Sequence, residues 1–365
     1  SLAFGGDGVG RLEDGRVVFV PFSAPGDLLE VEVVSNRKSF LRAKIVRILQ
    51  ASPSRCEAPC QHFTRCGGCS YQHIDYELEF AAKQQQLKDL LQRMAGIKEE
   101  IELDSAFPAP ELYGYRNKLK LAPSEAVRDD HGVHMNYGYF FKEEEDFFTV
   151  TECPLAMPII NRNLRRAVQS PWGWQNAKKE VPAHLTMRAD ARETCQFYFG
   201  RAPANVSWLR EMIFDTEVSV PLGSFWQVNP KVAEKLFLTI SSWAEELDAD
   251  FLIDSYSGVG TFAMAIQRNF KERILIENDR QALDAAEFNL KQLKLKHRII
   301  KEKTESALAK VLRKLPANKT LLVLDPPRSG CQEKVIQTIY KFKPAHLFYI
   351  SCNPSTLARD LKKLL

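Results

Sequence analysis

The sequence predicts an α/β protein whose C-terminal part is a doubly wound, mostly parallel sheet, preceded by a small β-barrel and an α+β region. Five apolar runs alternate with helical segments, a pattern typical of parallel sheets with helices on both faces. These runs cover residues 251–254, 273–277, 298–302, 320–325 and 346–351. Short alternating runs separated by Gly and Pro fill the N-terminal part, which favours a small barrel of about five strands.

Changes in this pattern divide the chain into three expected domains. Residues 1–55 form the β-barrel, 56–215 a cysteine-rich loop with an α+β central domain, and 216–365 the doubly wound domain. A helix over 76–95 is predicted by leucines at helical spacing, with Gly96 as its stop, and it can pack on the third domain. Asn229 and Pro230 are a good start for a further helix.

The composition is that of an ordinary globular protein, 45% hydrophobic and 26% charged over 365 residues. No apolar run is long enough to cross a bilayer and no signal peptide opens the chain, so we expect no membrane contact and a cytoplasmic location. The net charge of +4 hints at an anionic partner. Residues 33–55 contain six basic and no acidic side chains, which is compatible with a cationic binding face or with a merely solvated one.

The segment 254–261, Asp-Ser-Tyr-Ser-Gly-Val-Gly-Thr, follows the first strand and opens a helix. Gly258 and Gly260 let the backbone turn tightly and approach a ligand, although a lone Gly-x-Gly also suits a plain turn. Glu277 ends the next strand, where a carboxylate can accept both ribose hydroxyls of a nucleoside. Ala263 stands at the third glycine of the dinucleotide fingerprint. NAD stays possible, but S-adenosylmethionine (SAM), which has no pyrophosphate, fits this acidic loop better.

The segment 325–331, Asp-Pro-Pro-Arg-Ser-Gly-Cys, follows the fourth strand, at the edge where open α/β sheets keep their active sites. Cys331 is a candidate nucleophile, and Arg328 is the local cation that could lower the pKa of its thiol. The alternative is a structural cysteine at the start of a helix, since free cysteines are commonly buried.

Eight cysteines in a cytosolic chain are poor candidates for disulfides. Four of them lie within fourteen residues and indicate a metal site; they are Cys56, Cys60, Cys66 and Cys69. Thiolates at such spacings suit either an iron–sulfur cluster or structural zinc. Five residues separate Cys60 from Cys66, so the spacing is not that of radical SAM enzymes.

Several long motifs resemble those of the SAM-dependent RNA 5-methyluridine methyltransferases, specifically the iron–sulfur, TRAM-bearing members that modify 23S rRNA. The motifs lie at residues 19–21, 25–27, 60–73, 115–118, 153–155, 224–229 (Ser-Phe-Trp-Gln-Val-Asn), 254–262, 325–331 and 351–360 (Ser-Cys-Asn-Pro-Ser-Thr-Leu-Ala-Arg-Asp). The resemblance covers nearly the whole chain. It implies a Rossmann-like SAM methyltransferase domain behind a TRAM-like, OB-like barrel that binds RNA.

The resemblance also implies a role for each candidate residue at the catalytic edge. The thiolate of Cys331 adds to C6 of a uracil, which makes C5 nucleophilic enough to take the methyl group of SAM, while Asp325 hydrogen-bonds the target base. Cys352 is interpreted as structural. The catalytic set is completed by Arg328, and the SAM contacts are Gln227, Tyr256, Gly258, Glu277 and Asp325.

The ligands of a [4Fe–4S] cluster follow from the same resemblance, with zinc as the alternative metal. They are Cys60, Cys66, Cys69 and Cys153. Cys56 stands where the family does not require a ligand, although it could replace Cys60. The cluster is expected to fix its loop and the helix over 76–95 against the central domain.

The expected substrate is a uridine of 23S rRNA, with a T-loop uridine of tRNA as the runner-up. The barrel, Arg116 and Lys118 would hold the phosphates, and the target base must leave its stack before C6 can be reached. From a different class, the chain could be an RNA-binding iron–sulfur protein without catalysis; Cys331, Asp325 and Gln227 together argue against that. We expect a monomer.

The family's general base is a glutamate in a His-x-Val-Glu-like segment near the C-terminus, and it removes the C5 proton. The printed sequence contains no such segment. We therefore expect the third domain to lack its C-terminal hairpin. A protein that ends at Leu365 should then bind SAM poorly or stall as a covalent RNA adduct, and multiple-turnover methylation would contradict this expectation.

Overall fold

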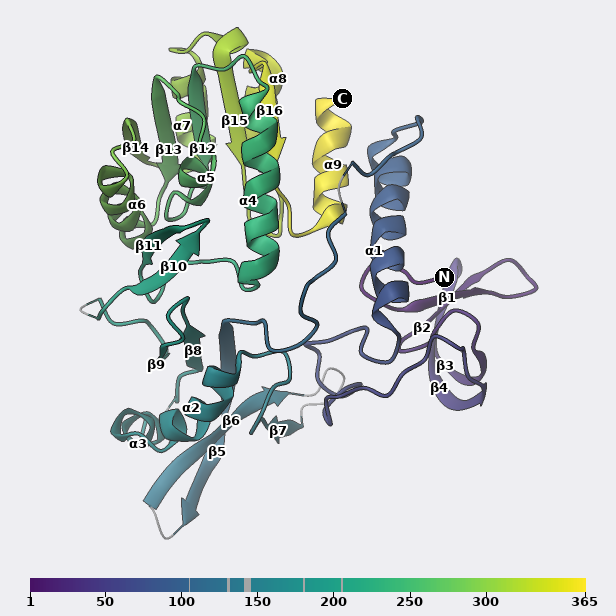
Figure 1. Cartoon of the computed structure of the whole chain (residues 1–365). Coiled ribbons are helices and arrows are strands. Elements are labelled where there is room, and N and C mark those ends of the chain that lie inside the picture. Colours follow the sequence, from purple (N-terminus) through teal and green to yellow (C-terminus); the bar gives the residue numbers. More distant parts are fainter. Residues whose placement is uncertain (105, 130–131, 141–145, 180, 205) are drawn as a thin grey trace.

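The computed structural model describes residues 1–365 except 105, 130–131, 141–145, 180 and 205. Three sheets of four or five strands follow one another along the chain, with a separate hairpin between the second and the third (Figure 1). Within the described residues, no helix is both long and apolar enough to cross a membrane.

The N-terminal sheet has four strands in the order β1-β2-β4-β3. They are β1 Gly8–Arg11, β2 Val17–Val20, β3 Leu28–Asn36 and β4 Phe40–Gln50. β4 pairs parallel with β2 and antiparallel with β3, and register shifts interrupt the β3–β4 ladder. The expected count of about five strands is too high, because one long, bulged strand serves two neighbours.

One helix runs from the cysteine-rich loop to the C-terminal part of the molecule. α1 (Tyr76–Leu90) begins at Asp75, whose side chain accepts a backbone hydrogen bond, and continues as a single π-helical turn, η1 (Leu91–Ala95). Gly96 ends it in the left-handed conformation with φ of 81°. Both α1 and η1 contact α9 (Pro354–Leu364), which lies beside α1 in Figure 1.

The central sheet is antiparallel, in the order β7-β6-β5-β8-β9, and two helices pack on it, as expected of an α+β region. The strands are β5 Lys118–Asp129, β6 Gly132–Phe140, β7 Phe147–Thr149, β8 Leu185–Ala189 and β9 Cys195–Phe199, and the helices are α2 Pro158–Val168 and α3 Pro171–Ala177. A hairpin of β10 (Leu209–Ile213) and β11 (Thr216–Val220) leads into the next sheet.

The C-terminal sheet is parallel, in the order β14-β13-β12-β15-β16, and all five expected strands are present. They are β12 Phe251–Ser255, β13 Glu272–Glu277, β14 His297–Lys301, β15 Thr320–Leu324 and β16 His346–Tyr349. The remaining helices are α4 Pro230–Glu245, α5 Thr261–Ala265, α6 Arg280–Gln292, α7 Thr304–Leu312 and α8 Glu333–Phe342, with a 3₁₀ turn, η2, at Ala317–Lys319. The helix predicted at Pro230 is α4, and Asn229 caps it.

The strand order reverses between β12 and β15. From β12 the chain moves outward through β13 to β14, and then returns to place β15 on the other side of β12. Apolar clusters bury both faces of the sheet. Ligands of open α/β sheets bind at such a reversal, outside the carboxyl ends of the strands. The loops after β12, β13, β15 and β16 therefore position the candidate site.

Candidate active site

The loop after β12 packs closely against β13 and α6 through Gly260. Gly260 has a φ of 80°, and a Cβ on it would lie 3.0 Å from Leu275 Cδ2 and 3.3 Å from Ala286 Cβ. Asp254 is fully buried beneath the loop, and its Oδ2 accepts a 2.9 Å hydrogen bond from the Ala263 amide. Burial raises the pKa of Asp254 to about 8. The buried Asp254 side chain thus holds the start of α5, which follows the glycine loop, by a hydrogen bond.

Glu277, at the end of β13, holds the other side of this loop. Its Oε2 accepts a 3.0 Å hydrogen bond from the Gly258 amide, and its Oε1 accepts from the amides of Asn278 and Asp279 at 2.6 and 2.9 Å. Two cofactor residues predicted from separate strands, Glu277 and Gly258, therefore lie in direct contact.

A cavity of about 250 Å³ opens beside Glu277, at the carboxyl ends of the strands. Tyr256 and Ile276 stand in its wall. In the same loop, the hydroxyl groups of Ser255 and Ser257 are buried without a hydrogen-bond partner among the described residues. These groups fit a nucleoside, because they offer apolar contacts to a base and a carboxylate to a ribose.

Gln227 is positioned by the central sheet. Asn117 Nδ2 donates a 3.0 Å hydrogen bond to the Gln227 carbonyl, and Arg188 of β8 donates to the carbonyl oxygens of Leu222 and Ser224 at 3.1 and 2.6 Å. The Gln227 residue is half-buried, and it is not among the described residues that line the cavity beside Glu277. Its contact with SAM stays a prediction.

The thiol of Cys331 is enclosed by other side chains. The residue is 7% exposed, and its thiol is in hydrogen-bond contact with the hydroxyl groups of Tyr256 and Tyr349. Its amide donates a 2.8 Å hydrogen bond to Asp360 Oδ2, which also accepts one of 2.6 Å from the Tyr349 hydroxyl. Burial, with a further contribution from the Asp360 carboxylate, raises the pKa of Cys331 to about 11. Little thiolate, the reactive form, is therefore present at neutral pH.

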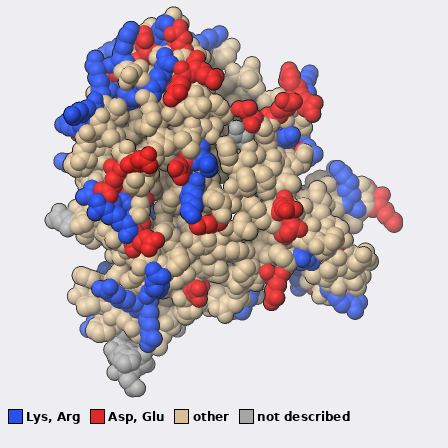
Figure 2. Space-filling model, viewed as in Figure 1, with Lys and Arg blue, Asp and Glu red and all other residues tan. Residues whose placement is uncertain are grey.

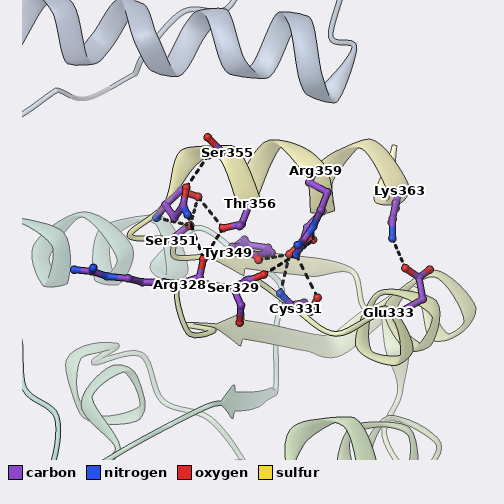
Figure 3. Close-up of polar contacts among 12 residues, drawn as sticks. Arg328, Ser329, Cys331, Glu333, Tyr349, Ser351, Ser355, Thr356, Arg359 and Lys363 are labelled. Carbon is purple, nitrogen blue, oxygen red and sulfur yellow. Dashed lines mark hydrogen bonds and ion pairs between the residues drawn. The ribbon is translucent and has the colours of Figure 1, made fainter. Parts of the chain in front are cut away.

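The cation near Cys331 is Arg359 rather than Arg328. Figure 3 shows the Arg328 side chain extending away from Cys331, while its carbonyl accepts a 3.3 Å hydrogen bond from Asn353 Nδ2. Arg359 donates through Nε and Nη2 to Asp360 Oδ1 at 2.8 and 2.6 Å, and its charge favours the Cys331 thiolate. The reason for the difference is that Arg328 lies on an exposed turn, whereas α9 brings Arg359 over the end of that turn.

Cys352, interpreted from the sequence as structural, is an exposed thiol at this edge. It follows β16 and lies two residues before Pro354, the first residue of α9, where helix amides favour a negative charge. β16 pairs with β15, and beyond the paired residues the Ile350 amide donates to the Leu324 carbonyl at 2.8 Å. Asp325 and Cys352 thus follow neighbouring strands to one edge of the sheet.

Asp325 is half-buried between the ends of β12 and β15. Its amide donates a 3.4 Å hydrogen bond to the Ser255 carbonyl. Burial raises the pKa of Asp325 to about 7. A carboxyl group that titrates near neutrality can accept or donate a hydrogen bond, so it suits a polar ring with both kinds of group.

The four predicted metal ligands gather where the cysteine-rich loop meets the central sheet. Cys66 and Cys153 pack against the core of that sheet, and Cys60 and Cys69 lie within electrostatic range of both. Burial raises the pKa of Cys69 to about 11. In the part of the chain that the structure describes, no three Cys, His, Asp or Glu side chains lie close enough together to hold a metal ion.

A second cavity, of about 890 Å³, lies between this loop and α1. Cys56 and Cys69 stand in its wall together with aromatic side chains, among them Tyr71, Phe107 and Tyr113. The Cys56 side chain is exposed. Aromatic rings can stack on unpaired bases, and the sequence did not indicate this cavity because its wall comes from separate segments.

The basic stretch of the N-terminal sheet is largely neutralised by its neighbours. Arg42, Lys44 and Arg47 pair with Asp7, Glu32 and Glu30 at 3.4, 2.8 and 3.0 Å, and Arg55 pairs with Asp27 at 2.7 Å. All four acids lie outside the window of residues 33–55, so the charge count within that window overstated the cationic face. Arg116 and Lys118 are half-buried, and burial lowers the pKa of Lys118.

Comparison with known proteins matches most of the chain. A family model described as tRNA (uracil-5-)-methyltransferase matches residues 210–365, and a model of the TRAM domain matches residues 1–46. An uncharacterized RNA methyltransferase of Nostoc sp. is 30% identical, over 98% of this chain and 87% of the relative. The 23S rRNA (uracil(1939)-C(5))-methyltransferase RlmD of Pseudomonas putida is 28% identical, over 100% of this chain and 86% of the relative.

One solved structure supports the fold over nearly the whole chain. It is the tRNA (uracil-54, C5)-methyltransferase of Pyrococcus abyssi in complex with S-adenosyl-L-homocysteine, with a TM-score of 0.67 and 23% identity. The match covers 98% of this chain and 93% of that chain.

Proposed function

Because the chain belongs to the SAM-dependent RNA uracil-C5 methyltransferase family and carries a TRAM domain, we propose that it methylates C5 of a uridine in 23S rRNA. The ribosomal substrate is supported by the relative from Pseudomonas putida. The observation that carries the proposal is the edge shared by Asp325 and Cys352, beside the glycine loop. A tRNA uridine is the second candidate, favoured by the match to the tRNA (uracil-5-)-methyltransferase family model.

We assign SAM to the cavity beside Glu277. A Cβ on Gly258 would meet no atom of the described residues within 4 Å, so the backbone is open to the nucleoside there, and Glu277, which accepts three hydrogen bonds, keeps acceptor capacity for a ribose hydroxyl. Tyr256 and Ile276 would flank the base. When bound, SAM supplies the methyl group as an electrophile. Gln227 and Asp325 are proposed as its further contacts.

We propose Cys352 as the nucleophile, in place of Cys331. A thiolate at Cys352 attacks C6 of the uracil and forms a C–S bond, while the electron pair of the C5–C6 double bond moves into an enolate across C5 and O4. C5 takes the methyl group. A base then accepts the C5 proton, and the electron pair of the broken C–H bond re-forms the C5–C6 double bond as the C–S bond breaks and the thiolate leaves. Cys331 suits this role less, because burial raises the pKa of its thiol to about 11 and leaves the residue only 7% exposed.

Asp325 is proposed to orient the uracil ring. When ionised, it can accept a hydrogen bond from N3–H of the ring. When protonated, which its pKa of about 7 permits near neutrality, it can donate to O4 and stabilise the enolate. Both protonation states of Asp325 would assist addition of the thiolate to C6 of the uracil.

The test of this proposal is an adduct assay with RNA that contains 5-fluorouridine. Fluorine cannot leave as a proton does, so a covalent protein–RNA adduct should accumulate when SAM is present. We expect Cys352→Ser to abolish the adduct and Cys331→Ser to retain it. The reverse pattern would assign the nucleophile to Cys331, and wild-type protein without any adduct would contradict the covalent mechanism.

The substrate is tested in the same assay with two RNAs. Unmodified 23S rRNA and unmodified tRNA transcripts are supplied separately, and 5-methyluridine is measured in each by mass spectrometry of nucleosides. The proposal expects product in 23S rRNA. Product in tRNA alone would replace it by the second candidate.

We further propose that Cys60, Cys66, Cys69 and Cys153 hold a [4Fe–4S] cluster, with zinc as the alternative. Cys66 and Cys153 pack against one core and Cys60 and Cys69 lie within electrostatic range of both, which supports this. The Gly68 amide also donates to Cys66 Sγ at 3.4 Å, in the manner of amides around metal thiolates. Coordination requires the thiols to lie closer together than they do in the described chain.

The metal proposal predicts a clear difference between two cysteine variants. Cys153→Ser should lower the iron or zinc content per chain, because it removes a ligand, whereas Cys56→Ser should leave it unchanged. Metal analysis of anaerobically purified proteins measures both, and the visible absorption of a cluster distinguishes iron–sulfur from zinc. An equal loss in both variants would place Cys56 among the ligands.

A further inference from the structure

Three arginines form an unneutralised row on α2. Arg162, Arg165 and Arg166 stand at positions i, i+3 and i+4 of the helix, which lie on one face, and all three are exposed. In the part of the chain that the structure describes, none of them forms an ion pair. The row therefore differs from the basic stretch of the N-terminal sheet, where acidic neighbours take up most of the charge.

An exposed aromatic ring stands next to this row. Trp172 is 65% exposed, and its ring meets Phe197 edge to face with centroids 6.1 Å apart. The turn that carries it is tightly built: Ser170 Oγ accepts a 3.1 Å hydrogen bond from the Gly173 amide, and a Cβ on Gly173 would lie 2.2 Å from the Val168 carbonyl. A large apolar ring is therefore kept at the surface by a turn that cannot easily rearrange.

The arginines and the ring share one hollow of about 650 Å³. Its wall includes Arg162, Arg165, Arg166, Gln169, Trp172 and Phe197, and no Asp or Glu among the described residues. We name it the α2–α3 hollow. Figure 2 shows Lys and Arg side chains gathered over α2 and α3, on the face that Figure 1 presents.

We propose that the α2–α3 hollow binds single-stranded nucleotides of the RNA substrate outside the target uridine. The guanidinium groups are suited to phosphates, to which they can bind through two parallel hydrogen bonds. The exposed indole face is suited to stacking on an unpaired base. Within the described residues, three arginines without an ion pair and one exposed ring lie together, which suits the phosphates and the flat bases of single-stranded RNA. This inference rests on the proposed function, since it assumes an RNA substrate.

The experiment measures binding of a fluorescein-labelled oligouridylate to the full chain at several salt concentrations. The triple variant Arg162→Ala, Arg165→Ala, Arg166→Ala should bind about tenfold more weakly or worse at low salt. Its plot of log affinity against log salt should be shallower by about 2, because each contact to a single-strand phosphate contributes about 0.7. Trp172→Ala should bind about 5- to 150-fold more weakly with an unchanged slope, the range expected for a lost stacking contact.

Two controls separate the hollow from general effects of charge and folding. The matched triple variant Arg313→Ala, Lys314→Ala, Lys341→Ala removes three exposed charges at the opposite, amino edge of the parallel sheet, and it should bind RNA as wild type does. Trp172→Phe keeps a ring and should retain most of the affinity. Thermal unfolding followed by circular dichroism shows whether each variant is folded.

The outcomes distinguish this inference from the proposed function. If the triple arginine variant and Trp172→Ala bind RNA with the affinity and salt slope of wild type, the inference is overturned. The α2–α3 hollow would then contact a protein partner or only solvent. An equal loss in the matched triple variant would overturn it too, because the effect would then be general charge. The proposed function fails by a separate result, the absence of 5-methyluridine in RNA incubated with wild-type protein.

Discussion

Two buried carboxyl groups near the carboxyl edge of the parallel sheet have opposite hydrogen-bond environments. Asp360 is 1% exposed and accepts hydrogen bonds from the Cys331 amide, the Tyr349 hydroxyl and the Arg359 guanidinium. Asp254 is fully buried, and only its Oδ2 accepts a hydrogen bond among the described residues, while Oδ1 has no partner. An ion with few partners is costly to bury, so the ionised form of the Asp254 side chain is disfavoured in the folded chain.

Asp254 is predicted to make the protein less stable as the pH rises through the acid range. Its pKa is about 8 in the folded chain and near 3.8 in the unfolded chain, so between these values the folded chain keeps a proton that the unfolded chain has released. The free energy of unfolding therefore falls with rising pH within this window and levels off above it. Asp254→Asn, which can still accept from the Ala263 amide, should remove this part of the slope.

Urea unfolding of wild type and Asp254→Asn without SAM, between about pH 5 and pH 7, measures this effect. The two midpoints should converge at the acid end and separate toward neutrality, with wild type the less stable. Parallel curves would mean that Asp254 is ionised throughout the range.

Among the elements, β8 is difficult to predict from the sequence, whereas the strands of the parallel sheet are not. The strands of the parallel sheet alternate with helices of ordinary length, so each apolar run has a separate partner. β8 has the sequence Leu-Thr-Met-Arg-Ala, which neither alternates nor is uniformly apolar, yet all five residues are buried. Arg188 can be buried there because the carbonyl groups of Leu222 and Ser224 accept its hydrogen bonds, and those residues are distant in sequence.

The two cysteines of the edge show a similar limit of sequence reasoning. Cys331 and Cys352 each follow a strand of the parallel sheet and precede a helix, so the local sequence pattern predicts the same position for both thiols. What separates them is enclosure by Tyr256, Tyr349 and Asp360, which come from three other segments. The sequence predicts that segments 254–261 and 325–331 lie at the site, but the burial of the Cys331 thiol depends on the tertiary structure.

Arg188→Met is predicted to destabilise the protein by about 2–6 kcal/mol, because it leaves two buried carbonyl groups without a donor, at about 1–3 kcal/mol each. The variant loses the hydrogen bonds to Leu222 and Ser224 and leaves Glu211, 3.8 Å away, without its cation. Urea unfolding measures the loss. The matched change Arg192→Ala breaks an exposed ion pair on a nearby turn and should cost at most about 1 kcal/mol.

Equal costs for the two variants would mean that Arg188 contributes no more than a surface arginine. If Arg188 positions the segment before Gln227, the variant should also raise the KM for SAM, an effect that general destabilisation alone would not produce at a temperature where the protein remains folded.

In the whole molecule, the N-terminal sheet meets the cysteine-rich loop and α1 through an apolar cluster of Leu2, Ala24 and Ile74, and polar contacts hold the loops of the sheet. Asp27 accepts hydrogen bonds from the Arg55 guanidinium and from the amides of Ala24 and Ser52. Burial alone would raise the pKa of Asp27, but these hydrogen bonds outweigh it and hold the pKa below its ordinary value. Gln86 of α1 adds hydrogen bonds to the carbonyl groups near the N-terminus.

Asp27→Asn is predicted to loosen the N-terminal sheet while the parallel sheet stays protected. Hydrogen exchange in residues 1–50 should rise by about tenfold or more, because a lost hydrogen bond to a charged group costs about 1.5–3 kcal/mol. Since the folded pKa is depressed, wild type should keep this stabilisation above about pH 4 and lose it at lower pH. Peptide-resolved mass spectrometry measures the exchange.

Asp14→Asn serves as the control, because Asp14 pairs with Arg16 in an exposed ion pair of the same sheet. It should leave exchange in residues 1–50 close to wild type. Exchange that rises equally in both variants, or that rises over the whole chain, would contradict a local role for Asp27.

The contact of α1 and η1 with α9 has a consequence for synthesis of the chain. On the ribosome, α1 emerges long before the residues of α9, so during most of translation one of its packing surfaces has no partner. Such an exposed surface is a site for misassembly or chaperone binding. The packing surface for α1 is therefore complete only after the parallel sheet and α9 have been synthesised. The N-terminal helix can reach its final packing only after the C-terminal part has folded.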